Sequence, residues 1–167
     1  MSGGTTLRQW DGQDLRDLLA LEAVSPTHWR NRCGDANTHG SAYGGQLLAQ
    51  ALTAAAGTAP AGRPPTMMQF LFLQSARHDE PIDFHVTPLQ DGKRFSSRHV
   101  RGAQRGSRAV LDAQVSFSVP FDAPSHGAPP PADWGGETDP AALPTVHELP
   151  RDFGERVRRT VGYEFFE

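Results

Sequence analysis

Two adjacent glycines, Gly44 and Gly45, stand directly before a run of strong helix formers that begins at Gln46. Glycine has no side chain, so a ligand can approach its backbone closely. Free N–H groups at a helix N-terminus also stabilise negative charge. Such donors suit the oxygen of a carbonyl group whose carbon is under nucleophilic attack. A tight turn that uses the wide φ range of glycine is the competing structural interpretation, and both can hold at once.

Gln46 and Gln50 lie one helical turn apart and therefore on one face of the same helix. Their amides are able to orient a water molecule or a carbonyl group, so Gly45, Gln46 and Gln50 are the candidate catalytic residues. In the alternative interpretation the amides cap backbone groups or form hydrogen bonds across a subunit contact. This alternative is preferred for Gln46, and the two interpretations are evenly matched for Gln50.

Arginines recur in the C-terminal part of the region expected to form a sheet. They are Arg94, Arg98, Arg101, Arg105 and Arg108. Arginine binds phosphate well, so Arg94 and Arg98 join Gly44 as candidate substrate-binding residues. A solvated sheet face is the simpler explanation for most of the five. The seven histidines show no metal-ligand spacing, and we expect neither a metal nor another cofactor.

Two helices and several strands are expected to position these residues. The helices are predicted over residues 14–24 and 46–58, the second with alanines that allow close packing. Strands are predicted over 28–32, 66–75, 82–86, 94–104 and 109–119, with a tight turn at Asp91-Gly92. In the segment 66–75 we expect Met67, Met68, Phe70 and Phe72 to belong to a plain core rather than to line a tunnel for an apolar ligand. This order predicts an α+β domain in which an antiparallel sheet curls round one central helix.

Composition limits the class of protein further. The chain has 167 residues, a formal charge of −3 and 37% hydrophobic residues, which suits one ordinary domain without a basic surface for nucleic acid. A single cysteine, Cys33, excludes an internal disulfide. There is no signal-like leader and no apolar run of membrane-spanning length. We therefore expect a cytoplasmic protein that binds neither nucleic acid nor membrane.

Prolines divide the chain into three parts. Eight of the 14 prolines fall between residues 120 and 150, which predicts a linker or wrapping loop over 121–150 after a domain over 1–120. Residues 151–167 regain helical and strand-like spacing. We expect them to open a second domain.

Three strings resemble the acyl-CoA thioesterase II family. They are residues 43–52 (YGGQLLAQAL), residues 91–100 (DGKRFSSRHV), and the pair 116–120 (SFSVP) and 124–126 (PSH). Together they span roughly residues 15–130 in the family's order. The resemblance implies a hot-dog fold, the first of two in a double hot-dog thioesterase. The family's catalytic Asp, Ser or Thr, and Gln belong to the second domain. The family's His-rich strand is replaced here by residues 67–76 (MMQFLFLQSA).

The resemblance implies hydrolysis of fatty acyl-CoA to free acid and CoA. Asp35 and His39 keep one alternative open, because residues 35–39 are similar to the Asp-x-Asn-Pro-x-His motif of hot-dog enoyl-CoA hydratases. The proline is missing here and the histidine comes one residue early, so an Asx-rich turn is preferred. A non-catalytic acyl-binding or assembly half-domain is the third possibility. The expected partners are acyl-CoA and either a second copy, as a homodimer, or a second hot-dog domain.

Overall fold

The computed structural model describes residues 7–37, 39–124, 126–129, 142–144, 148, 150 and 152. Its main element is a six-stranded sheet in which every neighbouring pair is antiparallel. The strands, in their order across the sheet, are β2 (Leu21–Ser25), β3 (His28–Asn31), β6 (Asp83–Asp91), β7 (Phe95–Gln104), β8 (Arg108–Ser118) and β5 (Pro65–Phe72). The short strands β1 (Arg8–Gln9) and β4 (Cys33–Gly34) form a separate parallel pair.

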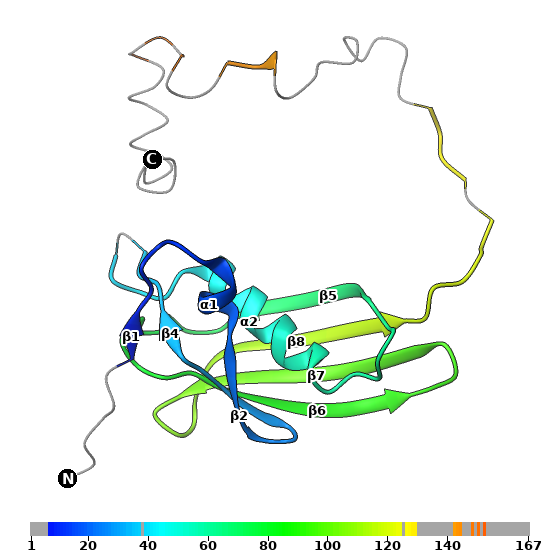
Figure 1. Ribbon diagram of the computed structural model, residues 1–167, viewed down its shortest axis with the longest axis horizontal. Helices are drawn as coiled ribbons and strands as arrows, with labels where there is room; N and C mark the ends of the chain where they lie inside the picture. The colour runs from blue at the N-terminus through cyan, green and yellow to red at the C-terminus, as the bar shows by residue number, and fades with distance from the viewer. Residues whose placement is uncertain are drawn as a thin grey trace. The chain divides into compact units, whose positions relative to one another are not determined.

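The long helix α2 (Gly44–Ala56) lies against one face of this sheet (Figure 1). Ala51, Ala54 and Ala55 have no exposed surface and belong to one core with apolar side chains of the strands. Small side chains let the helix backbone approach the sheet closely. The expected α+β class, an antiparallel sheet around one central helix, is therefore confirmed.

The two hairpins that join β6 to β7 and β7 to β8 follow the turn signals in the sequence. In the first, the Gly92 N–H donates a hydrogen bond to the carbonyl of Phe95 at 2.8 Å. In the second, Arg105 and Gly106 both have positive φ, at 52° and 81°. The predicted Asp91-Gly92 turn is therefore correct, and it fixes the register of the strands that follow.

The helix predicted over residues 14–24 is wrong in its second half. The helix α1 covers only Leu15–Leu19, with the Asp14 side chain accepting a hydrogen bond from the Arg16 N–H. The chain becomes extended at Ala20 and continues as β2, which pairs with β3. Pairing along the sheet edge therefore overrides a weak helical pattern that Leu15, Leu18 and Leu19 alone had suggested.

The chain divides into two units, Met1–Phe121 and Asp122–Glu167. Most of the expected linker, 121–150, and nearly all of 151–167 lie outside the described residues. The expected start of a second domain therefore stays a prediction. Among the described residues, neither helix has the length and apolar character that a membrane span requires.

Candidate functional site

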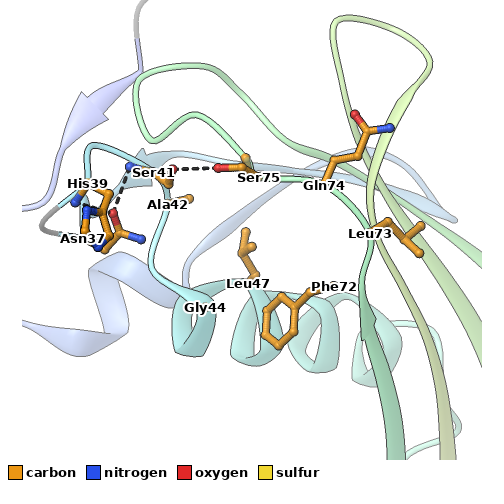
Figure 2. Close-up of a pocket in the computed structure, with 11 residues that line it drawn as sticks. Asn37, His39, Ser41, Ala42, Gly44, Leu47, Phe72, Leu73, Gln74 and Ser75 are labelled. Atoms are coloured by element: carbon orange, nitrogen blue, oxygen red, sulfur yellow. Dashed lines mark hydrogen bonds between the residues drawn. The ribbon is translucent and has the colours of Figure 1, made fainter. Parts of the chain in front are cut away.

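A groove of about 490 Å³ opens beside the first turns of α2 (Figure 2). One wall comes from the loop before the helix and from the helix itself, and the other from the chain that leaves β5. The lining residues are Asn37, His39, Ser41, Ala42, Gly44, Leu47, Phe72, Leu73, Gln74, Ser75 and Ala76. Its volume is that of a pocket for a small organic ligand, and it combines an apolar part with a polar part.

The N-terminus of α2 forms part of this groove through Gly44. Among the described residues, no acceptor is paired with the backbone N–H groups of Gly44, Gly45 or Gln46, while the Leu47 N–H donates to the Tyr43 carbonyl at 3.2 Å. The first N–H groups of a helix lack partners inside the helix, and together with the helix dipole they attract negative charge. The end of the helix therefore borders the groove at Gly44, and its use as a donor for an oxyanion remains a prediction.

Close approach of other side chains explains why both positions are glycine. A Cβ atom at Gly44 would lie 3.3 Å from two ring carbons of Phe72, and one at Gly45 would lie 2.7 Å from a ring carbon of Tyr43. Gly45 is exposed and Gly44 is half-buried. The lack of side chains here keeps the helix end open to the groove.

Hydroxyl and amide groups line the polar part of the groove. The Ser41 and Ser75 hydroxyls lie 2.6 Å apart, and Asn37 Oδ1 accepts hydrogen bonds from the backbone N–H groups of His39 and Ser41. Figure 2 shows these side chains on the side of the groove away from Phe72. This arrangement brings hydrogen-bonding groups and an apolar wall together within one groove.

Gln46 and Gln50 face away from solvent, with 2% and 0% of their surfaces exposed. Gln46 Nε2 donates to the Cys33 carbonyl and to Gln50 Oε1, both at 3.3 Å, and Gln46 Oε1 accepts from the Asp35 N–H at 2.9 Å. Gln50 Nε2 donates to the Leu18 carbonyl at 2.7 Å. These contacts favour the structural interpretation, in which the two amides attach the N-terminal segment to α2. A catalytic role for either residue remains a prediction.

Arg98 lies near the opposite end of α2 and is 1% exposed. Its guanidinium donates to the hydroxyl and carbonyl of Thr58, to the carbonyls of Gln90 and Ser97, and to both carboxylate oxygens of Asp91. Each guanidinium nitrogen therefore has a protein partner. The contacts favour a structural role that ties the end of α2 to the β6–β7 hairpin, and substrate binding by Arg98 remains a prediction.

Arg94 also lies far from the groove, in the β6–β7 hairpin. Its guanidinium carbon stands 5.5 Å from the centre of the Phe121 ring, which packs edge-on against Phe95. The 13 residues of α2 span about 20 Å, so the structure does not bring Arg94 and Arg98 together with Gly44. Arg105 pairs with Glu80, whereas Arg108 binds the side chain of Gln74 and the carbonyl of Ser75, two residues that line the groove.

Asp35 and His39, the pair that suggested a hydratase, do not both line the groove. His39 lines it and is exposed, whereas Asp35 is not among the lining residues. The backbone of Asp35 accepts a hydrogen bond from the Tyr43 N–H and donates one to Gln46. This is the local hydrogen bonding of a turn before a helix, as the preferred interpretation of the sequence had it.

Several lining residues were not identified from the sequence. Ser41 and Ser75 are 34 residues apart, and nothing in their spacing indicates that their hydroxyls meet.

Met67 and Phe72 were expected in a plain core, but they are 50% and 62% exposed. They lie on an edge strand, and the position of a strand within a sheet cannot be read from its alternation alone.

Two of the ionisable groups with perturbed pKa values outside the groove are the Cys33 thiol and the Asp91 carboxyl. Burial, followed by the nearby charge of Asp17, raises the pKa of the Cys33 thiol. Hydrogen bonds from Ser96 and Arg98 lower the pKa of the Asp91 carboxyl. In the described residues, no group of three or more His, Cys, Asp and Glu side chains is arranged to hold a metal ion.

Comparisons with known proteins extend this description. A family model described as "Acyl-CoA thioesterase N-terminal domain" matches residues 34–118. The chain is 32% identical over 107 residues to Acyl-CoA thioesterase 2 of Haemophilus influenzae, covering 64% of this chain and 37% of that protein. It is 30% identical over 131 residues to mouse Acyl-coenzyme A thioesterase 8, covering 72% of this chain and 41% of that protein.

Solved structures of thioesterases share the fold of this chain. A tesB protein of Mycobacterium avium subspecies paratuberculosis is 32% identical, with a TM-score of 0.62 over 71% of this chain and 48% of that one. An acyl-CoA thioesterase II from Mycobacterium marinum is 24% identical, with a TM-score of 0.66 over 84% of this chain and 54% of that one. The chain spans about two fifths of the length of the curated relatives named above. On the match over residues 34–118 and the hot-dog architecture that contains it, the chain belongs to the acyl-CoA thioesterase family, whose N-terminal domain it carries.

Proposed function

We propose that this protein hydrolyses fatty acyl-CoA to a free acid and CoA. The observation that carries the proposal is that the N–H groups of Gly44 and Gly45 have no acceptor among the described residues, at the end of a helix that borders a partly apolar groove. Membership of the thioesterase family supports the same reaction. The names of the relatives give acyl-CoA as the compound class.

In the proposed reaction the thioester carbonyl oxygen accepts hydrogen bonds from the N–H groups of Gly44 and Gly45. Water adds to the carbonyl carbon, negative charge grows on the oxygen, and these donors stabilise it. The C–S bond then breaks, the proton released by the water goes to the thiolate, and acid and thiol leave. Gln46 and Gln50 hold the helix in place, and the residues that activate the water come from a second hot-dog domain.

The strand β5 is the surface proposed to meet that second domain. It forms one edge of the sheet, and it exposes about half or more of the side chains of Met67, Leu71 and Phe72. An uncovered apolar edge strand invites pairing with another strand. We propose that a second copy of this chain, or a second hot-dog domain, pairs along β5. The groove then lies beside the contact.

A substitution at the first helical residue tests the proposed donor. In Gly44→Pro the N–H is removed, and proline is tolerated because Tyr43 before it is already extended, with φ −67° and ψ 132°. Gly44→Ala adds the same Cβ contact but keeps the N–H, so it is the matched control. We expect turnover of acyl-CoA by Gly44→Pro to be roughly 100-fold below that of Gly44→Ala.

Binding is measured in parallel, with ketone analogues of acyl-CoA in which a methylene replaces the thioester sulfur. We expect these analogues to bind Gly44→Pro about tenfold more weakly than Gly44→Ala, because one hydrogen bond to the carbonyl is lost. Equal turnover and equal affinity in the two variants would contradict the proposed role of the helix end.

A panel of acyl-CoA and enoyl-CoA substrates separates the competing functions. Hydrolysis releases free thiol, hydration consumes the enoyl absorbance, and a binding module does neither while still retaining the ketone analogue. We expect thiol release, weak in the isolated chain if the second domain is absent. A cytoplasmic location and a role in fatty acid metabolism are the further parts of this proposal.

A further inference from the structure

Phe72 has an unusual environment for its position in the sheet. It pairs in register with Leu111, as Phe70 pairs with Ala113 and Met68 with Val115. All three partners are buried, so these β5 side chains belong to the face of the sheet that packs against α2. Phe70 and Met68 are half-buried as expected, but Phe72 remains 62% exposed.

The ring of Phe72 lies against the first turn of α2, beside Leu47 (Figure 2). Two of its carbons are 3.3 Å from the place where a Cβ on Gly44 would stand, and its centre is 4.6 Å from that of Phe70. The remainder of the ring faces the groove and solvent. Because most of the Phe72 side chain makes no packing contacts, it can change rotamer at a small cost in free energy.

We propose that Phe72 is a specificity-determining residue that closes the apolar end of the groove and limits the length of the acyl chain. This inference rests on the proposed function, because it takes the thioester carbonyl to lie at Gly44. A chain that extends past Leu47 along β5 meets the Phe72 ring and must displace it. The strand beyond offers the apolar side chains of Phe70 and Met68, which would line a longer channel once the ring is gone.

The test measures the affinity of the ketone analogues from butyl to hexadecyl for the wild type and for Phe72→Ala. Affinity should rise about fourfold for each methylene that is buried, and then stop rising where the ring blocks the chain. We expect that limit to move by at least two methylenes in Phe72→Ala, so that longer analogues bind about 16-fold more tightly than to the wild type. Phe72→Leu should give an intermediate limit.

Leu71→Ala is the matched control. Leu71 is the neighbouring residue and is 51% exposed, but it lies on the opposite face of the strand. Its removal disturbs the same sheet edge and should leave the limit where the wild type has it. An identical limit in Phe72→Ala and the wild type would overturn the inference alone. Failure of every analogue to bind the wild type would overturn the proposed function itself.

A second measurement needs no ligand. Thermal unfolding of Gly44→Ala, Phe72→Ala and the double variant forms a double-mutant cycle. The methyl group at residue 44 should lower the unfolding midpoint when the ring is present and have a smaller effect when the ring has been removed. Strictly additive shifts would mean that the ring does not lie over Gly44 in solution, and the inference would then fail.

Discussion

Cys33 is fully buried and its thiol donates a weak hydrogen bond to the Asp17 carbonyl at 3.4 Å. Burial raises its pKa, so less reactive thiolate is present near neutral pH than for an ordinary thiol. We expect the native protein to react with a disulfide reagent at pH 8 far more slowly than glutathione does. Unfolding in guanidinium should restore the rate of a simple thiol. Fast labelling of the native protein would contradict the burial of this site.

Asp91 provides a pH-dependent contribution to stability through its contact with the buried guanidinium of Arg98. Its pKa is lowered in the folded protein, chiefly by hydrogen bonds from Ser96 and Arg98. The contribution is therefore complete above the unfolded pKa of about 4 and is lost as the pH falls through the lower folded pKa. We expect Asp91→Asn to unfold at a lower temperature than the wild type at pH 7.

The difference between Asp91→Asn and the wild type should shrink as the pH falls below about 4. Asp122→Asn is the control, because that carboxylate is exposed. A difference between Asp91→Asn and the wild type that stays constant with pH would show that the charge of Asp91 does not matter.

Single residues differed in how well the sequence revealed their roles. Gly44 and Gly45 were proposed as site residues because glycine at the start of a helix has a direct physical meaning, and Gly44 does line the groove. The buried position of Arg98 was missed although a signal existed, since Arg98 shares the alternation phase of Ser96 and Val100, both of which are buried. An arginine on the inward phase of a strand predicts a buried, fully bonded guanidinium rather than a ligand site.

At the scale of elements, α2 depends on its small side chains. Ala55 has no exposed surface, so Ala55→Asp would place a carboxylate in the core without a partner. We expect the free energy of unfolding to fall by about 3–5 kcal/mol, measured by denaturant titration. Ala56→Asp is the control, because Ala56 is exposed on the same helix. Similar effects of the two substitutions would mean that the helix face is not packed as described.

The amides of Gln46 and Gln50 connect α2 to the segment before it. Gln50→Leu would leave the Leu18 carbonyl without its donor, and we expect a loss of about 1–3 kcal/mol in the free energy of unfolding. Gln114→Leu, at an exposed position of β8, should change it little. If Gln50→Leu keeps its stability but loses thioester turnover, the catalytic interpretation of Gln50 would be the correct one.

Elements with a strong local pattern were predicted closely, and those decided by neighbours were not. The helix at residues 44–56 was expected two residues later, and β8 was expected within one residue of its bounds. β2 was missed because its apolar residues, Leu21 and Val24, do not alternate with polar residues as in a typical strand. The strand forms because it pairs with β3. Tertiary pairing of this kind is outside the reach of a local pattern.

At the scale of the whole molecule, the exposed side chains of β5 predict association. We expect the chain to sediment as a dimer at micromolar concentration, because burying apolar surface is favourable and edge strands pair readily. Met67→Lys places a charge on this edge, where 50% of the methionine is exposed, and should shift the protein toward monomer. Gln114→Lys is the control, because Gln114 is exposed on β8 but is paired on both sides, with Gln69 of β5 and His99 of β7. A monomeric wild type would contradict pairing along β5.

The groove illustrates what the sequence could not supply at this scale. Its walls come from two stretches, 37–47 and 72–76. They meet only because β5 pairs with β8 at the edge of the sheet. The resemblance in residues 43–52 gave one wall, and the unusual segment 67–76 gave no indication of the other. Predicting the groove required the position of β5 in the sheet, which depends on contacts between residues far apart in the chain.

The amide contacts of Gln46 and Gln50 also show that the segment matched by the family model is shorter than the segment needed for folding. The family match begins at residue 34, after Leu18 and Cys33, whose carbonyls accept these hydrogen bonds. A recombinant fragment cut to residues 34–118 would lose β2 and β3 and leave two buried amides without their acceptors. Such a fragment should be found in inclusion bodies, whereas one that starts before Leu7 retains the contacts described above for Leu18 and Cys33.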